Sequence, residues 1–484
     1  MYFNDGKRID IWRDSMKVKS SAPSLTHRRA ASMRTRSSSH RKYSSISLAL
    51  KKFLSRSKIS GISIGTEYAS LAEATDRILA DCIRCPIDIP PFQRSTVDGF
   101  AILSSDTKKK ATRDYHHNHD ATLNVIGEIV AGKISQTRIS SGKAVAIATG
   151  AKIPRGADSV IMIEDVIVEE GNNNKGSKIR ISRRIDRGSN ITPRGNDLKK
   201  GQILLKKGTW LTAADIGLIA SVGISRILVY KKVKVAVLST GNELAEPGSK
   251  LGSASVFDSN RFMLSSMVRK YGGEPVDLGL CRDEKSLIRT KIMKALKKFD
   301  VILISGGSSV GEKDYVPRLI NEVGKPGIIV SGIAMKPGSP TSLGIANGKP
   351  VIVLPGFPVS AFVAFYTFGR ALLYNIVKTD GPPVARQVAK LTSNVKLHKG
   401  MTTFVRVRIF RRHDDDDDGC FFAEPVSAAG ASLLSTLAYS DGIVVAKYNS
   451  RELQRENDDI MLRKGQEVEV ILLKDVHHRQ EEAA

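Results

Sequence analysis

The stretch VILISGGSSVGEKDY, residues 301–315, joins a short apolar run to a loop of glycine, serine and acidic residues. Apolar, β-branched runs of this length are typical of strands that are buried on both faces of a sheet. Four other apolar runs between residues 233 and 354 also lead into short loops, which begin at Thr240, Arg282, Lys336 and Gly356.

Helix-like segments separate several of these runs, which indicates parallel pairing in an α/β domain. Open parallel sheets collect their ligands at the carboxyl ends of their strands. We therefore expect the five loops to meet in one crevice.

The loop from Ser305 to Tyr315 indicates which ligand this crevice holds. Its glycines let backbone N–H groups approach an anion, its hydroxyls can donate to phosphate oxygens, and its acids can hold a hard cation. These three groups are Gly306, Gly307 and Gly311; Ser305, Ser308 and Ser309; and Glu312 and Asp314. A simple strand-to-helix turn is the alternative. The density of glycine, serine and acid favours a site for a phosphorylated ligand with a divalent cation.

The neighbouring loops offer further groups, each with a simpler alternative. Glu243 in Thr240-Gly241-Asn242-Glu243 could bind a cation or lie exposed in a turn. Asp283 is expected to cap the following helix, whether or not it also binds metal. Lys336 precedes the stiff turn Pro337-Gly338-Ser339-Pro340, which favours a phosphate-binding lysine over a free surface lysine.

Composition bounds the class of protein. The 484 residues include 75 Lys and Arg against 49 Asp and Glu, a net charge of +26, and residues 1–60 hold 15 of the bases with only three acids. The rest of the chain is moderately basic, which favours an anionic substrate, and no specific nucleic-acid motif accompanies the charge. Four cysteines are too few for a disulfide framework and fit a reducing, cytoplasmic compartment. No apolar run appears long enough for membrane insertion.

Changes of composition along the chain suggest its organisation. Residues 1–48 are rich in Ser and Arg, with few apolar residues, and predict a disordered basic tail. Residues 67–80 have apolar positions at helical spacing and predict an amphipathic helix. Short β-like runs over residues 100–185 indicate a small β domain, in which Asp98-Gly99 and Thr149-Gly150 have the composition of ordinary turns.

The segments that flank the α/β domain have their own patterns. Within residues 203–230, LTAADIGLIASVG predicts a helix and RILVY a strand. Residues 385–474 return to β-rich patterning and predict a small barrel or sandwich.

Eight motifs then resemble those of a known family in their sequence and order. They are PPFQRSTVDGFAI, ATGAKIPRGADSVIMIED, RGNDLKKGQILLKKGTWLTAADIGLIASVGI, LSTGNEL, DSNRFML, SGGSSVGEKDYV, MKPGSP and LPGFPVSA. This series resembles the molybdopterin molybdenumtransferase (MoeA) family, which is similar to the C-terminal domain of gephyrin. The resemblance covers roughly residues 65–470 and leaves out the N-terminal tail.

The resemblance implies an elongated homodimer with an α/β multidomain subunit. Its central α/β domain has three layers and is of the molybdopterin-binding type, with an inserted β domain and a β-barrel-like C-terminal domain beside it. The implied parts are a tail at 1–48, a discontinuous N-terminal domain at 49–96 and 186–231, the inserted β domain at 97–185, the α/β domain at 232–380 and the C-terminal domain at 381–484.

The resemblance also implies a transferase of molybdenum cofactor biosynthesis. This enzyme would insert molybdate into adenylylated molybdopterin and release AMP, with Mg²⁺ as the divalent cation. The implied catalytic acids are Asp98, Asp197, Glu243, Asp283 and Asp314, the last three as metal ligands. The implied substrate-binding residues are Thr149, Ser305, Gly306, Gly307, Ser308, Ser309, Gly311, Lys336, Pro337, Gly338, Pro355 and Gly356.

Asp98 and Thr149 are implied to reach the crevice of the other subunit. The implied partners are a molybdopterin adenylyltransferase and molybdoenzymes. Two positions depart from the family pattern: Phe357 stands where Asn is frequent, and Ser308 stands where an apolar residue is common. Either change could alter the choice between molybdate and tungstate.

Two other functions fit parts of the sequence. A non-catalytic, gephyrin-like scaffold would not need the acids that this chain retains. A nucleotide hydrolase, as in the competence-damage proteins, could use the same α/β domain, but the additional β domain and C-terminal region argue against it.

Overall fold

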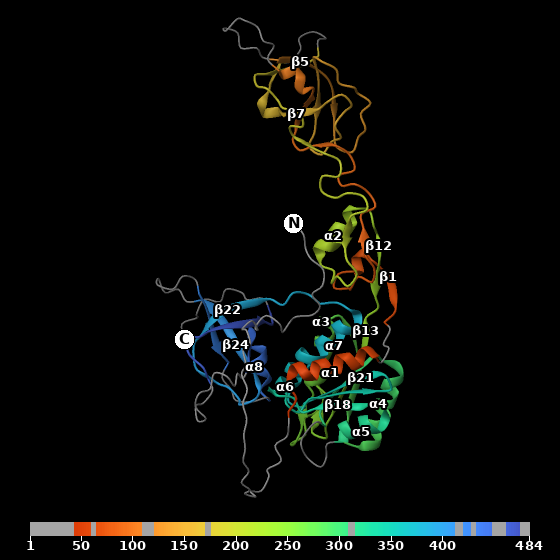
Figure 1. The fold of residues 1–484 in the computed structure, drawn as a ribbon, viewed down its shortest axis with the longest axis vertical. Helices are drawn as coiled ribbons and strands as arrows, with labels where there is room; N and C mark the ends of the chain where they lie inside the picture. The colour runs from red at the N-terminus through yellow and green to blue at the C-terminus, as the bar shows by residue number, and fades with distance from the viewer. Residues whose placement is uncertain are drawn as a thin grey trace, which may run out of the picture.

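The computed structural model describes residues 43–59, 64–108, 121–169, 176–307, 315–411, 420–426, 432–447 and 461–474. Figure 1 shows an elongated molecule. The β-rich part that carries β5 and β7 lies at one end, and the α/β layers lie with the C-terminal β region at the other. The acidic run at 414–418 and the histidines at 116–119 lie outside the described residues.

A six-stranded sheet forms the centre of the α/β region, in the order β16-β13-β17-β21-β20-β18. Its first four strands are parallel, as predicted. They are β16 (Gly273–Cys281), β13 (Val233–Thr240), β17 (Val301–Ser305) and β21 (Lys349–Leu354). The last two, β20 (Ser342–Ala346) and β18 (Gly327–Ser331), are antiparallel to their neighbours.

Helices cover both faces of this sheet and complete the three predicted layers. Alternate side chains of β13 face opposite ways: Val235 and Val237 pack with one set of helices, Ala236 and Leu238 with the other. The first set is α1 (Ile46–Ile59), α3 (Asn260–Lys270), α6 (Pro358–Ala364) and α7 (Arg370–Val377). The second set is α4 (Lys285–Lys298) and α5 (Tyr315–Val323). The sheet is therefore buried on both faces, as its continuous apolar runs require.

Helix α1 begins inside the range that was predicted to be a tail. Ile46, Ala49, Leu50 and Phe53 are buried in the core of the α/β region. Their spacing of three and four residues is the period of one helix face, and this signal was overlooked among the surrounding bases. The folded body therefore starts before residue 48, and residues 1–42 lie outside the described part.

The segment IIVSGIAM does not form one strand that ends at Lys336, contrary to the sequence prediction. Strand β18 ends at Ser331, and Gly332 follows in the left-handed region with φ 77°. This conformation favours glycine and turns the chain out of the central sheet. Met335 and Lys336 then form β19, which pairs with β24 (Thr402–Arg411) of the C-terminal region.

The predicted helix over residues 67–80 is wrong. Residues Thr66–Ser70 form β1, which pairs with β12 (Arg226–Tyr230), and a short 3₁₀ turn follows. Leu79 then bridges to Val229, so both ends of the segment pair with the same strand. Tertiary pairing overrides a helical pattern of this length. The predicted helix and strand at 203–230 are confirmed as α2 (Ala213–Ser221) and β12.

The described residues also form two further six-stranded sheets. The inserted sheet has the order β7-β4-β6-β5-β9-β8. Its strands are β7 (Ser159–Met162), β4 (Gly99–Ile102), β6 (Lys143–Ile147), β5 (Ala121–Ile129), β9 (Lys178–Ile181) and β8 (Ile167–Glu169). In the C-terminal region, β24, β25 (Phe421–Pro425), β22 (Arg386–Leu391), β28 (Glu467–Leu472) and β26 (Gly442–Ala446) close into a barrel, because β26 also pairs with β24.

Among the described residues, the helical stretch Pro358–Val377 is long and apolar enough to cross a membrane by composition. The sequence prediction was that no apolar run reaches this length. Its most apolar window is 78% buried inside the protein, against the central sheet. Packing in the core accounts for its apolar character.

Candidate functional site

Loops at the carboxyl ends of β17 and β21 meet, as the parallel sheet predicts. The side-chain Nδ2 of Asn260 donates to Ser305 Oγ and to the backbone oxygen of Gly356, both over 2.7 Å. The backbone N of Gly306 donates to the oxygen of Leu354 over 3.1 Å. Asn260 begins α3 and is 7% exposed, so one buried amide joins three elements. Sequence reasoning missed this residue, although it lies in the quoted motif DSNRFML.

Gly306 and Gly307 lie against the end of β13. Both have positive φ angles, 97° and 63°. A Cβ on Gly306 would lie 2.1 Å from the backbone oxygen of Thr240, and one on Gly307 would lie 2.5 Å from Val316 Cγ2. These positions therefore require glycine for its conformation and for its small size.

Two buried polar atoms at this place have no hydrogen-bond partner among the described residues, Thr240 Oγ1 and Asn260 Oδ1. Buried polar groups in proteins are nearly always paired, so unpaired ones mark a place where water, an ion or a ligand binds. They lie in the loop region that was predicted to receive an anion.

Hydrogen bonds connect two neighbouring acidic loops, the loop of Glu243 after β13 and the loop of Asp283 after β16. The backbone N of Gly241 donates to the oxygen of Cys281 over 3.2 Å, and the N of Asp283 donates to Asn242 Oδ1 over 3.1 Å. Glu243 and Asp283 are both exposed on these loops. Carboxylates on adjacent loops fit Mg²⁺, which prefers a few carboxylate oxygens together with water and substrate phosphates.

The third predicted metal ligand, Asp314, lies outside the described residues, together with Ser308, Ser309, Gly311 and Glu312. In the described part of the chain, no three His, Cys, Asp or Glu side chains are grouped so that they could hold a metal ion. The described part of the chain therefore offers at most two protein ligands for the divalent cation, Glu243 and Asp283.

Asp283 does not cap helix α4, contrary to the prediction. The helix begins at Lys285 after Glu284, and Glu284 makes no side-chain cap bond. At the start of α3, Asp258 is the residue whose side chain bonds to the helix. Its Oδ1 accepts from the backbone N of Arg261 over 3.2 Å, while Ser259 makes no cap bond.

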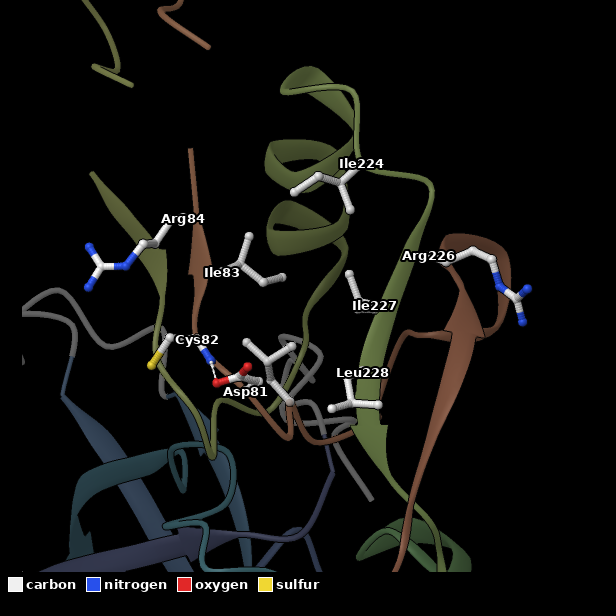
Figure 2. Close-up of a pocket in the computed structure, with 9 residues that line it drawn as sticks. Asp81, Cys82, Ile83, Arg84, Ile224, Arg226, Ile227 and Leu228 are labelled. Atoms are coloured by element: carbon white, nitrogen blue, oxygen red, sulfur yellow. Dashed lines mark hydrogen bonds between the residues drawn. The ribbon is translucent and has the colours of Figure 1, made fainter. Parts of the chain in front are cut away.

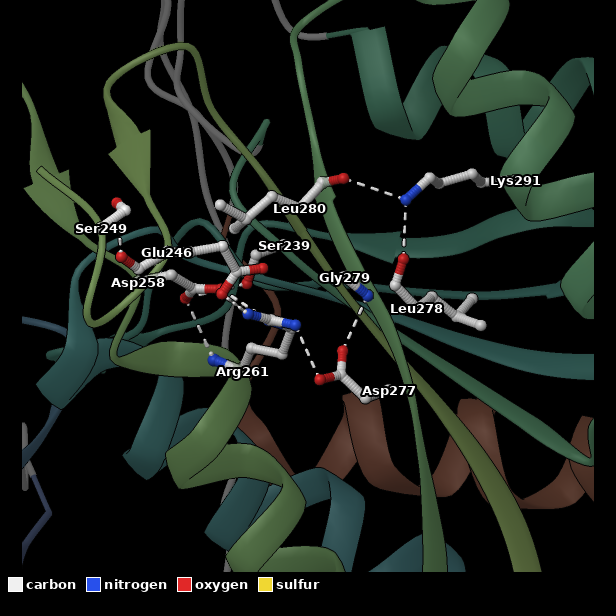
Figure 3. Close-up of polar contacts among 10 residues, drawn as sticks. All are labelled: Ser239, Glu246, Ser249, Asp258, Arg261, Asp277, Leu278, Gly279, Leu280 and Lys291. Carbon is white, nitrogen blue, oxygen red and sulfur yellow. Dashed lines mark hydrogen bonds and ion pairs between the residues drawn. The ribbon is translucent and has the colours of Figure 1, made fainter.

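A buried arginine that sequence reasoning missed joins three carboxylates beside the acidic loops (Figure 3). Arg261 is 5% exposed and pairs with Asp258, Asp277 and Glu246. Burial would lower the pKa of its guanidinium, but hydrogen bonds to Asp277 and Asp258 outweigh burial and raise it. Arg261 therefore keeps its charge, and the cluster holds the segment after Glu243 against helix α3.

Lys336 lies on β19, which follows β18 in the chain and belongs to the sheet of the C-terminal barrel. It is exposed and pairs with Thr403 of the C-terminal barrel. Pro337 and Gly338 follow it, and the oxygen of Gly338 accepts from Thr341 N and Oγ1, over 3.1 and 2.7 Å. Lys336 is therefore presented by the joint between the α/β region and the barrel.

Asp98 and Thr149 lie together in the inserted β region. The backbone N of Thr149 donates to Asp98 Oδ1 over 2.7 Å, and both residues are exposed. The inserted sheet lies at the opposite end of the molecule from the central sheet (Figure 1). Within one chain, these two residues are therefore remote from the acidic loops. Asp197 is also exposed, and its backbone N donates to the oxygen of Ile89 over 3.0 Å.

A shallow recess of about 220 Å³ lies beside β12, and no predicted site residue lines it (Figure 2). Its lining mixes apolar residues such as Ile83, Ile224 and Ile227 with Asp81, Arg84 and Arg226, and the charged ends of the two arginines point away from each other. Nothing in this recess resembles the predicted anion site.

Sequence models of three families match the chain one after another. The MoeA N-terminal region (domain I and II) matches residues 44–223, a probable molybdopterin binding domain matches 236–375, and the MoeA C-terminal region (domain IV) matches 388–473. A Haemophilus influenzae protein named molybdopterin molybdenumtransferase is 35% identical over 386 residues, which are 78% of this chain and 89% of that protein. This chain belongs to the molybdopterin molybdenumtransferase family.

Other members of the molybdopterin molybdenumtransferase family agree in length and fold. A Bacillus subtilis relative of that name is 30% identical over 85% of this chain and 90% of its own length. The crystal structure of a molybdopterin biosynthesis MoeA protein from Pyrococcus horikoshii is 30% identical, with a TM-score of 0.70, and the match covers 89% of this chain and all of that one. The resemblance stated from the eight motifs is thereby confirmed.

Proposed function

We propose that this protein acts in molybdenum cofactor biosynthesis, where it inserts molybdate into adenylylated molybdopterin and releases AMP. The observation that carries the proposal is the group of loops that meet at the carboxyl edge of the central sheet. There the glycine turn Gly306–Gly307 and the loops of Glu243 and Asp283 follow three neighbouring strands, and the buried amide of Asn260 joins the start of α3 to this edge. Membership of the family supports the same reaction.

The chemistry of these residues suits a substrate with phosphate groups. Backbone N–H groups of the glycine turn, with the hydroxyls of Ser305, Ser308 and Ser309, would hold phosphate oxygens. A Mg²⁺ ion held by Glu243, Asp283 and Asp314 would neutralise charge on the bridging oxygens when bound. Gly311, Pro355 and Gly356 would complete the same surface, and Lys336, with Pro337 and Gly338, would add a positive charge from the barrel side.

We propose that the active protein is a homodimer. Asp98 and Thr149 are remote from the acidic loops of their own chain, yet the family resemblance assigns both to the site. A partner subunit in the opposite orientation would bring them to the crevice. Asp197 would act near the same crevice. A cytoplasmic location, with a molybdopterin adenylyltransferase supplying the substrate and molybdoenzymes receiving the product, completes the proposal.

The two alternatives fit the chain less well. A nucleotide hydrolase would need only the α/β region, whereas family matches extend on both sides of it. A non-catalytic scaffold would not need exposed acids tied into position at the end of a parallel sheet.

The decisive experiment uses the full chain with adenylylated molybdopterin, molybdate and Mg²⁺. AMP release is measured by chromatography, and inserted molybdenum by reconstitution of an apo-molybdoenzyme. We expect both signals to appear together and to depend on molybdate and Mg²⁺. An Asp283→Ala variant serves as the matched negative control. Absence of both signals from a folded wild-type protein would refute the proposal, and nucleotide hydrolysis without molybdate would favour the hydrolase.

A further inference from the structure

Strand β16 contains a bulge just before the loop of Asp283. Val237 of β13 pairs with Asp277, but Ser239 pairs with Leu280, so two residues of β16 oppose one residue of β13. Gly279 within the bulge has φ 71°. An extra residue bends a strand and changes the direction of the side chains that follow, and such bulges are frequent beside functional sites. The bulge therefore sets the direction in which the chain leaves the sheet after Cys281, towards Asp283.

Lys291 of helix α4 holds this bulge (Figure 3). Its Nζ donates to the oxygen of Leu278 over 2.7 Å and to the oxygen of Leu280 over 2.9 Å. These two carbonyls flank Gly279, where the regular ladder with β13 is interrupted. A half-buried ammonium that bridges both sides of a bulge fixes its shape.

The other side of the bulge is connected to the Glu243 loop. Asp277 Oδ1 accepts from the N of Gly279 over 2.7 Å, and its Oδ2 accepts from Arg261 Nη1, also over 2.7 Å. Arg261 Nη2 contacts Glu246, three residues after Glu243. One chain of contacts thus runs from the bulge through Arg261 to the second acidic loop.

We infer that Lys291 and Arg261 are positioning residues, which fix the relative placement of Asp283 and Glu243 for the divalent cation. This inference rests on the proposed function, because it assumes that both carboxylates bind the ion. Neither Lys291 nor Arg261 needs to touch the ion or the substrate. Each acts on the backbone of one acidic loop: Lys291 through the bulge and Arg261 through Asp277 and Glu246.

The chain offers a matched control for the Lys291 contacts and another for the Arg261 contacts. Lys294 lies on the same helix as Lys291 but is exposed, and Lys294→Met makes the same chemical change as Lys291→Met away from the bulge. For the Arg261 contacts, Glu246→Gln weakens one ion pair of Arg261, while Arg261 itself remains to pair with the buried carboxylate of Asp258. Glu274→Gln changes an exposed carboxylate at the other end of β16 and serves as its control.

The test measures binding of Mn²⁺, a paramagnetic substitute for Mg²⁺, by electron paramagnetic resonance with the full chain, alongside AMP release and thermal melting. We expect Lys291→Met and Glu246→Gln to weaken Mn²⁺ binding about tenfold, the lower end for residues that orient metal ligands. The two control variants should bind as the wild type does. In an Asp283→Asn background, Lys291→Met should cause no further loss, because its effect passes through Asp283.

The outcomes separate the inference from the function on which it rests. If Asp283→Asn loses Mn²⁺ binding and AMP release while Lys291→Met and Glu246→Gln retain both, the positioning role is wrong and the proposed function stands. A lower melting temperature with unchanged Mn²⁺ affinity would show a purely structural role and also overturn the inference. If the wild type releases no AMP, or Asp283→Asn behaves as wild type, the proposed cation site fails and the inference fails with it.

Discussion

Replacement of Gly306 by alanine tests whether the glycine turn supports the reaction. The new Cβ would lie 2.1 Å from the backbone oxygen of Thr240, and separations below 3.0 Å are essentially never seen for Cβ atoms. The turn would have to move by about 0.9 Å or give up its φ of 97°. Displacements of about 1 Å at a reacting group cost roughly a hundredfold in rate, or about 2.7 kcal/mol of barrier. We also expect about 1–3 kcal/mol of lost stability from backbone strain.

Gly217 supplies the matched control, because it lies in helix α2, outside the crevice, and undergoes the same change from glycine to alanine. Its φ is not positive, and a Cβ there would meet no atom within 4 Å. Initial rates of AMP release at saturating substrate, with melting temperatures, should therefore separate Gly306→Ala from Gly217→Ala by roughly a hundredfold. A Gly306→Ala protein whose rate stays within about threefold of the control would refute the assigned role of the turn.

Three other perturbations follow from the structure. A chain that starts at Tyr43 should melt as the full chain does. A chain that starts at Ala49 lacks the buried Ile46, and its free energy of unfolding in urea should be lower by about 1.5–3 kcal/mol. Equal stability of the two shortened chains would contradict the packing of α1. Burial raises the pKa of Tyr374 to about 12, above the unfolded value of about 10, so stability should fall as the pH rises from 10 towards 12. Denaturation between pH 8 and 11 should show a smaller alkaline loss in Tyr374→Phe, and an identical loss would contradict the assignment. Mixing inactive Asp98→Ala and Asp283→Ala proteins under subunit exchange should restore part of the activity, and no recovery despite proven exchange would refute the shared site.

The parallel core of the fold could be predicted because its strands are buried on both faces. Continuous apolar runs such as VILIS are typical of such a sheet, and the glycines that follow them mark its carboxyl edge. Helix α1 also left a readable signal in Ile46, Ala49, Leu50 and Phe53, but the basic composition around it obscured the period.

Other features depend on contacts between residues that are distant in the sequence. Whether Glu67–Ala80 forms a helix or pairs with β12 is decided by residues 226–230, about 150 positions later. Arg261 and Asn260 could not be selected from sequence, because each gains its role from carboxylates, hydroxyls and carbonyls on several separate elements. The run IIVSGIAM predicted a single strand, because its apolar pattern does not show that one glycine, Gly332, transfers the chain from one sheet to another.

The segment that leads to Lys336 is bordered by two parts of the chain that are made at very different times. Ser44 exchanges hydrogen bonds with Gly332 and Ala334, over 3.1 and 2.8 Å, and Thr402 N donates to the oxygen of Ala334 over 2.9 Å. On a ribosome that adds about 5–20 residues per second, residue 402 follows residue 44 by roughly 20–70 s. The central sheet that α1 covers is complete only when β21 (Lys349–Leu354) has been made, so the apolar face of α1 has no complete sheet to cover for most of that interval. The segment around Lys336 is completed later still, when the barrel strand emerges.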